Sequence, residues 1–217
     1  MKNLTVALCT LNEEKNIYQC LKSVIKENPS QIIVIDGSSN DKTIEIAKKF
    51  KVKIIKVKRK GLGYQRKIGI DNVKTDYVCI LDADHRLRKG CLNRLMKEMK
   101  NNKYDGIQAS VKKRNVSKNY WSVCFDINFK ISHNIPRETI VIGGPCIYKT
   151  KVLKKTNFDP FITASSDDTD LSYRLKKKNH ILGVGKTIID ATHRSSFKDF
   201  FKKIIWYGKG DAQFIFK

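Results

Sequence analysis

Residues 76–84 read DYVCILDAD, an apolar run that ends directly in two carboxylates placed one residue apart. An uninterrupted apolar run of this length predicts a strand over 76–81 that is buried on both faces. Strands of this kind occur in parallel sheets that are covered by helices on each side. Asp82 and Asp84 would then lie in the turn that follows the carboxyl end of the strand.

The same pattern extends from this strand toward the N-terminus. LTVALCT at 4–10 and QIIVID at 31–36 predict two more buried strands, and 52–57 alternates apolar residues with lysine as an edge strand does. Regular alternation of strands and helices implies βαβ units and a mainly parallel sheet. Apolar residues at helical spacing predict helices between the strands, at 16–28, 42–50 and 62–73.

Toward the C-terminus the alternation continues less regularly. Helix 91–100 and strand 106–111 keep the rhythm of the first half. No low-complexity linker or repeat interrupts residues 1–217, so we expect a single α/β domain with helices on both faces of a Rossmann-like, mainly parallel sheet. The remaining predicted elements are helices at 118–132 and 168–177 and strands at 141–148 and 187–191.

The charge of the chain is strongly unbalanced, since 44 Lys and Arg against 21 Asp and Glu give a net charge of +23. Such a protein is attracted to nucleic acid, to an anionic membrane surface or to phosphorylated small molecules. A basic protein that binds nucleic acid without catalysis would show interleaved aromatic and basic residues, a helix-turn-helix or an RNP-like signature, and the sequence contains none of these. The six cysteines form no CxxC pair, which favours free thiols in a reducing compartment.

Polar side chains follow three of the predicted strands at their carboxyl ends, where α/β sheets bind their ligands. Two carboxylates in one turn can approach a single divalent cation, and oxygen ligands favour Mg²⁺ or Mn²⁺ over zinc. The residues are Thr10, Asn12 and Glu13 after the first strand, Asp36 on the second, and Asp82 and Asp84 after the third.

A second acidic cluster, Asp167-Asp168-Thr169-Asp170, opens the helix predicted at 168–177. Acidic residues at a helix start favour the helix dipole and cap its free N–H groups, and for Asp170 we expect no more than this. An acidic pair beside a metal and diphosphate site is also where a general base would lie.

Six short motifs follow one another in order along the chain. They are VALCTLNE at 6–13, IDGSSNDKT at 35–43, GYQRKIG at 63–69, LDAD at 81–84, GGPCIY at 143–148 and DDTDL at 167–171. This order resembles the GT-A fold glycosyltransferases of family 2, which are inverting enzymes that use nucleotide-diphospho-sugars. The resemblance implies a nucleotide-sugar-binding half at about 1–110 and an acceptor-binding half at about 111–217.

The resemblance also implies roles for particular residues. Asp168 would be the catalytic base, and Asp84, with Asp82, would hold Mn²⁺ or Mg²⁺. His193 is similar to a histidine that some members use as a further metal ligand, while Asp167 and Gly144 would contact the acceptor. The residues implied to bind the nucleotide-sugar donor are Thr10, Asn12, Glu13, Asp36, Arg66, Asp82 and Ala83.

The sequence departs from the family pattern at several places. Gly37 stands where a second acidic residue is frequent, which leaves the base, uridine or guanosine, open. Lys67 replaces a frequent asparagine and would either contact phosphate or lie on the surface. The sequence has no Q-x-x-R-W motif, which argues against a processive polysaccharide synthase. The alternative of a sugar nucleotidyltransferase calls for a Gly-rich phosphate loop after the first strand, but 10–16 reads TLNEEKN.

The segment FKDFFKKIIWYGKGDAQFIF at 197–216 predicts a basic amphipathic helix. Its apolar stripe would pack on the core or lie on an anionic membrane. The acceptor would then be a glycan or a lipid-linked molecule, attacked through a hydroxyl or a lipid phosphate, and no specific nucleic-acid partner is expected. With no signal peptide before the first strand and no apolar run of about 20 residues, we expect a cytoplasmic protein, peripheral at the cytosolic membrane face.

Overall fold

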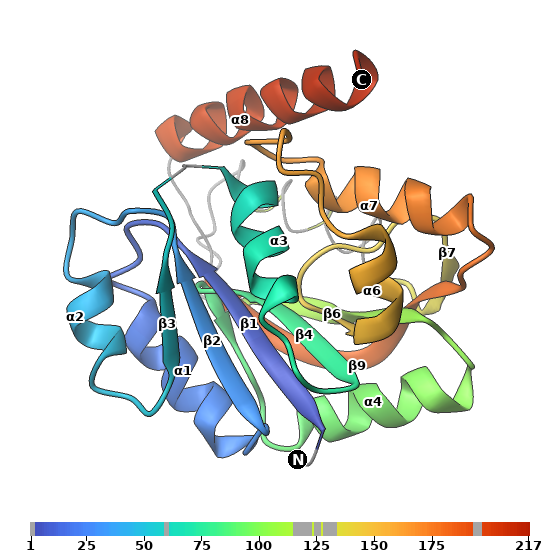
Figure 1. Cartoon of the computed structure of the whole chain (residues 1–217), viewed down its shortest axis with the longest axis horizontal. Helices are drawn as coiled ribbons and strands as arrows, with labels where there is room; N and C mark the ends of the chain where they lie inside the picture. The colour runs from blue at the N-terminus through green and yellow to red at the C-terminus, as the bar shows by residue number, and fades with distance from the viewer. Residues whose placement is uncertain (1–2, 59–60, 115–122, 124–126, 128–133, 193–196) are drawn as a thin grey trace.

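The protein was analysed as a computed structural model, which describes residues 3–58, 61–114, 123, 127, 134–192 and 197–217. Its centre is one sheet, which in the described part of the chain has the strand order β3-β2-β1-β4-β8-β6-β9-β5, with β7 also paired to β9 (Figure 1). The strands are β1 (Leu4–Thr10), β2 (Gln31–Asp36), β3 (Lys53–Lys56), β4 (Tyr77–Asp82), β5 (His85–Arg86), β6 (Gly106–Arg114), β7 (Arg137–Thr139), β8 (Cys146–Lys149) and β9 (Leu182–Thr192).

The N-terminal half of the sheet is parallel. β1 lies between β2 and β4, and its register pairs Thr10 with Asp36 and Cys9 with Asp82. The carboxyl ends of these three strands therefore meet at one edge, as the sequence predicted. β3 extends the parallel sheet beyond β2.

The C-terminal half makes the sheet mixed. β8 runs antiparallel to both β4 and β6, whereas β9 is parallel to β6 and antiparallel to the short strands β5 and β7. β8 thereby joins the parallel half to the later strands. The predicted fold class, an α/β domain with a mainly parallel sheet, is confirmed, with antiparallel strands added in its second half.

Helices cover both faces of the sheet (Figure 1). Alternate residues of β1 and β2 point to opposite faces: Leu4, Val6 and Leu8 pack with α1 and α4, while Ala7 and Ile33 pack with α3, α6 and α7. The helices are α1 (Ile17–Lys26), α2 (Thr43–Ala47), α3 (Leu62–Asp71), α4 (Cys91–Asn101), α6 (Thr150–Thr156), α7 (Asp167–Lys176) and α8 (Phe197–Ile215).

Two predicted strands differ from the structure. Only Cys146–Lys149 of the strand predicted at 141–148 is a strand, because the Gly143-Gly144-Pro145 segment before it consists of residues that disfavour strand pairing. The strand predicted at 187–191 is longer, since β9 begins at Leu182. The helix predicted at 118–132 falls almost wholly outside the described residues.

The cysteine prediction can be compared for five of the six residues. Cys9, Cys20, Cys79, Cys91 and Cys146 are free thiols, and Cys124 lies outside the described residues. Four of the five are buried, where a thiol packs as a small apolar side chain.

Candidate functional site

The loops after β1 and β2 are held together by a buried carboxylate. Asp36 is 1% exposed and accepts hydrogen bonds from Thr10 Oγ1 at 3.2 Å and from Ser39 N at 2.9 Å. Ser39 Oγ donates to Asp36 Oδ1 at 2.5 Å and accepts from Asn12 N at 2.9 Å. Three of the residues implied to bind the donor therefore form one hydrogen-bonded rim at the edge of the sheet.

Glu13 belongs to the same rim, at the start of α1. Its backbone N donates to Thr43 Oγ1 at 2.7 Å, and its carboxylate accepts from Asn16 Nδ2 at 2.8 Å. Glu13 thus ties the first loop to α2 while also ordering the first turn of α1.

Sequence reasoning missed Gln65, the residue before Arg66. The buried Gln65 side chain donates from Nε2 to Thr10 O at 3.0 Å and to Ile35 O at 3.3 Å, so it fastens α3 to the ends of β1 and β2. A Cβ at Gly37 would lie 2.5 Å from Gln65 Nε2. The glycine that departs from the family pattern therefore makes room for this amide.

Arg66 links two acidic segments that are far apart in the sequence. Its guanidinium, 5% exposed, contacts Asp167 Oδ2 at 2.8 Å through Nη1 and Asp82 Oδ1 at 3.3 Å through Nη2. It also lies over the ring of Phe158, 5.5 Å from the centroid. A buried guanidinium with this geometry fixes the position of both carboxylates.

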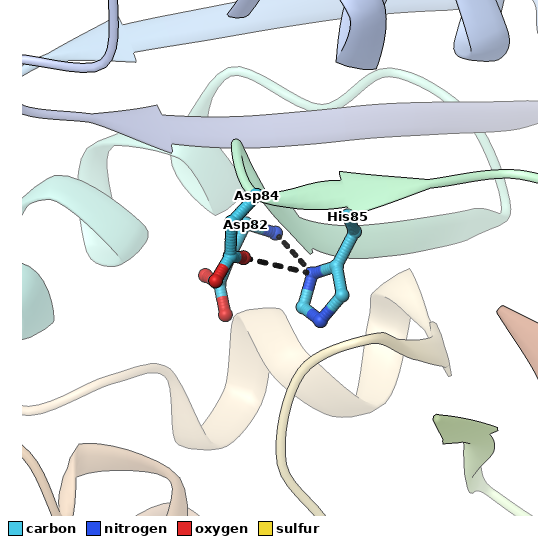
Figure 2. Close-up of side chains that lie close together, drawn as sticks. All are labelled: Asp82, Asp84 and His85. Carbon is cyan, nitrogen blue, oxygen red and sulfur yellow. Dashed lines mark hydrogen bonds and ion pairs between the residues drawn. The ribbon is translucent and has the colours of Figure 1, made fainter. Parts of the chain in front are cut away.

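Asp82, Asp84 and His85 form a compact cluster at the end of β4. One ligand atom of each lies within 4.8 Å of the others, and Figure 2 shows the two carboxylates gathered beside the imidazole ring. His85 Nδ1 lies 3.2 Å from Asp82 N and 3.7 Å from Asp84 Oδ1. His85 is buried, and the cluster is held in place by the pairing of β5 with β9.

The donor set of this cluster fits a divalent cation. Carboxylate oxygens suit Mg²⁺ and Mn²⁺. The side chains of Asp82 and Asp84 are 39% and 32% exposed, so their oxygens are accessible to an ion and to a ligand's phosphate oxygens. His193, predicted as a further ligand, lies outside the described residues, whereas His85, next to the DAD motif, was not predicted.

The second acidic pair lies at the start of α7, opposite the cluster. A Cβ at Gly143 would lie 2.5 Å from Asp168 Oδ2, and a Cβ at Gly144 would lie 3.1 Å from Asp82 Oδ2. The two bare glycines therefore run between the carboxylates of Asp82 and Asp168. Gly144, implied to contact the acceptor, does lie at the acidic site.

Asp167 and Asp168 differ in their surroundings. Asp167 is 1% exposed, and this burial raises its pKa to about 7. The positive charge of Arg66 lowers the pKa of Asp167, whereas the negative charge of Asp168 raises it further. Asp168 is half-buried and accepts from Thr169 N at 2.8 Å through Oδ1, which leaves Oδ2 beside Gly143. Of the pair, Asp168 has the position suited to accepting a proton from a ligand.

The remaining predicted residues have other surroundings. Ala83 packs in the hydrophobic core, and its carbonyl accepts from Arg86 Nη1 at 2.8 Å. Asp170 is 2% exposed and pairs with Arg174 and Lys217, a structural ion pair beyond the predicted capping role. Lys67 pairs with Asp71 on the exposed side of α3, which favours the surface reading of this residue.

Helix α8 is attached to the loop that carries the second acidic pair. Ser166 Oγ donates to Asp211 Oδ1 at 2.5 Å, and Ser165 Oγ lies 3.2 Å from Tyr207 O. Burial, with the charges of Asp168 and Asp82, raises the pKa of Tyr207 to about 12. Tyr207 therefore lies near both carboxylates, with its side chain 40% exposed.

A glycine on α8 gives a direct test of this attachment. A Cβ at Gly210 would lie 2.2 Å from Ser165 O, so we expect Gly210→Ala to force the helix away and lower the free energy of unfolding by about 1–3 kcal/mol. At Gly208 nothing lies within 4 Å, so Gly208→Ala should be neutral or stabilise by up to about 1 kcal/mol. Urea unfolding of both variants measures the difference, and equal effects would contradict the attachment.

The fold and the acidic edge define a GT-A-like α/β domain, and comparison with known proteins identifies its family. The family profile Glycosyl transferase family 2 matches residues 5–156. This match spans β1 to α6 and includes the Asp36, Arg66 and Asp82–Asp84 segments. The chain belongs to glycosyl transferase family 2.

Curated and solved relatives agree with this assignment. Over its whole length the chain is 27% identical to the dolichyl N-acetyl-alpha-D-glucosaminyl phosphate 3-beta-D-2,3-diacetamido-2,3-dideoxy-beta-D-glucuronosyltransferase of Methanococcus voltae, and it covers 75% of that protein. The mannosyltransferase PcManGT of Pyrobaculum calidifontis, in complex with GDP-Man and Mn²⁺, matches 99% of this chain with a TM-score of 0.74 at 14% identity. TarS of S. aureus in complex with UDP matches 93% with a TM-score of 0.70 at 20% identity.

The chain is shorter than these structural relatives. It spans 64% of the PcManGT chain and 63% of the TarS chain. At these identities the structural matches establish the shared fold.

Proposed function

We propose that the protein transfers a sugar from a uridine or guanosine diphosphate donor to an acceptor hydroxyl or phosphate, with inversion at the anomeric carbon. The observation that carries the proposal is the convergence of Asp82, Asp84, Arg66 and Asp168 at one edge of the sheet. These residues come from β4 and the turn after it, from α3 and from α7. Arg66 contacts Asp167, which lies 101 residues further along the chain.

The donor would lie along the rim made by Thr10, Asn12 and Asp36. Because Asp36 already accepts from Thr10 and Ser39, its main contribution is to hold the loops that contact the base. Asp82 and Asp84 would hold Mn²⁺ or Mg²⁺, which when bound neutralises charge on the donor diphosphate.

Asp168 acts as the base in this proposal. Oδ1 is occupied by Thr169 N, so Oδ2 accepts the proton of an acceptor hydroxyl as the oxygen attacks the sugar from the face opposite the leaving diphosphate. Arg66 stays paired with Asp167 and Asp82 and thereby holds the two acidic segments in fixed relative positions. Asp167, buried behind Arg66, orients the start of α7 on the acceptor side.

A thermal-unfolding panel tests the donor site. UDP and GDP are compared with and without Mn²⁺, since the structural relatives include one complex with UDP and one with GDP-Man. A ligand at 100 times its dissociation constant adds about 2.7 kcal/mol, which for a chain of this size raises the melting temperature by roughly 5–10 °C. We expect that shift for one of the two nucleotides, and only with the metal.

Two variants separate the metal site from general charge effects. Asp84→Asn should abolish the metal-dependent shift, while Asp71→Asn, which removes an exposed carboxylate from α3, should leave it intact. A well-folded protein that shifts with neither nucleotide would refute the donor site and favour a basic polyanion-binding protein.

A further inference from the structure

Helix α8 has a polar inner face that is fixed to the domain. A Cβ at Gly210 would lie 2.2 Å from Ser165 O, so no side chain fits there without movement. Asp211 accepts from Ser166, and Phe214 packs edge-on against Tyr173 at 6.2 Å. Lys217, one turn further on, contacts Asp170 Oδ1 at 2.9 Å. Residues at spacings of three and four thus turn one side of the helix toward α7.

The opposite face of α8 is apolar and exposed. Ile205 lies on this outer face and is 48% exposed, and Phe216, the first residue after the helix, is 89% exposed. Lys202 and Lys209 border them and are also exposed. In Figure 1 α8 lies across one end of the molecule, with the rest of the domain on one side of it only.

The apolar and basic residues on the outer face of α8 point to an anionic bilayer as its binding partner. Apolar side chains bordered by lysines on a surface helix match a bilayer whose headgroups are anionic, since the rings insert while the ammonium groups meet phosphate. The net charge of +23 adds long-range attraction to the same surface. Among the described residues no helix is long and apolar enough to cross a membrane, so contact through α8 would be along the surface.

We propose that the outer face of α8 docks the domain on an anionic lipid bilayer. Its inner face is bonded to Ser165 and Ser166, the two residues before Asp167 and Asp168. Docking therefore holds the start of α7 one helix diameter from the membrane surface. On the proposed function, this geometry selects acceptors whose reactive hydroxyl or phosphate is carried by a lipid.

Sedimentation with vesicles tests the docking without donor or acceptor. The full chain is mixed with phosphatidylcholine vesicles with or without about 30% phosphatidylglycerol, at about 0.1 M and about 0.5 M salt. We expect binding to the anionic vesicles at low salt, and retention of part of it at high salt through the apolar contacts.

Charge-matched variants locate the contact. Lys202→Glu with Lys209→Glu should weaken partition by about 30-fold or more, from roughly a factor of five per lysine. Lys22→Glu with Lys26→Glu makes the same change in net charge on α1, on the sheet face that α4 also covers, and should weaken it less than about threefold. Ile205→Ser with Phe216→Ser should remove the salt-resistant fraction. Ile25→Ser, at a position on α1 that is 41% exposed, should not.

Several outcomes would overturn the proposal. They are no binding at low salt, equal losses from the two lysine pairs, or a self-association, measured by light scattering, that Ile205→Ser and Phe216→Ser abolish. The last result would assign the outer face to a second copy of the chain. Nucleotide-dependent thermal shifts are scored separately, so failure of docking and failure of the donor site are distinguishable.

Discussion

Asp168→Asn is expected to lower the rate of sugar transfer to a hydroxyl acceptor by about 10²–10⁴-fold while leaving nucleotide binding unchanged. The amide keeps the shape of the side chain and cannot accept a proton at neutral pH. Asp168 is half-buried at the start of α7 and is not among the contacts of Arg66, so the loss should fall on turnover, with little change in stability.

The measurement is release of nucleoside diphosphate from the donor that the thermal panel selects, with hydroxyl and phosphate acceptors compared. Asp84→Asn should lose both the nucleotide shift and turnover, whereas Asp168→Asn should lose turnover alone. A phosphate acceptor is already an anion, so a small loss with phosphate and a large loss with hydroxyl would name the acceptor class. Full activity of Asp168→Asn on every acceptor would contradict its role as the base.

The strands that form the site could be predicted because their sequences are compatible with few other secondary structures. Leu4–Thr10 and Gln31–Asp36 are apolar runs with a polar residue at the carboxyl end, and the structure has both at the predicted bounds. Parallel pairing then brings Thr10, Asp36 and Asp82 to one edge, which needs only the βαβ rule.

The second half of the sheet could not be predicted in this way. The apolar pattern of Val141–Tyr148 gives no strand direction, and the Gly-Gly-Pro segment shortens the strand to Cys146–Lys149. The position of β8 between β4 and β6 depends on packing across the whole sheet, and local sequence patterns do not report such long-range contacts. The two- and three-residue strands β5 and β7 are too short to leave a periodic signal.

Within the candidate site, the acidic residues could be singled out from the sequence, whereas the side chains that contact them could not. The resemblance implies that Arg66 contacts the donor, and the structure adds that its guanidinium joins Asp82 to Asp167. Nothing in the spacing of residues 66, 82 and 167 indicates this bridge. His85 could have been singled out because it follows the DAD motif directly, although a histidine in that place is more often structural.

The largest effect on stability is expected from removal of this bridge. Arg66→Met leaves the carboxylate of Asp167, 1% exposed, without its guanidinium partner, and breaking a buried pair from one side costs about 3–5 kcal/mol. For a chain of this size the melting temperature should fall by roughly 6–20 °C. Lys67→Met, which breaks the exposed pair with Asp71 on the same helix, should change the free energy of unfolding by less than about 1 kcal/mol.

The pH dependence of the loss identifies its cause. The pKa of Asp167 in the folded protein, about 7, lies above the ordinary value of 3.8 for this side chain, so ionisation of this group lowers stability as the pH rises between those values. Without the positive charge of Arg66, the pKa of Asp167 in the folded protein rises further. The free energy of unfolding then continues to fall as the pH rises above 7. The loss in Arg66→Met should therefore be larger at pH 8 than at pH 5.

A double variant completes the test. Arg66→Met leaves the buried carboxylate of Asp167 without a partner, and Asp167→Asn removes the charge of that carboxylate. We expect Arg66→Met with Asp167→Asn to recover at least half of the lost stability and to lose the added pH dependence. Equal instability of the single and double variants at every pH would mean that Arg66 acts through its packing on Phe158 and not through the bridge. Recovery of folding without recovery of turnover would show that the bridge also sets the distance between Asp82 and the start of α7.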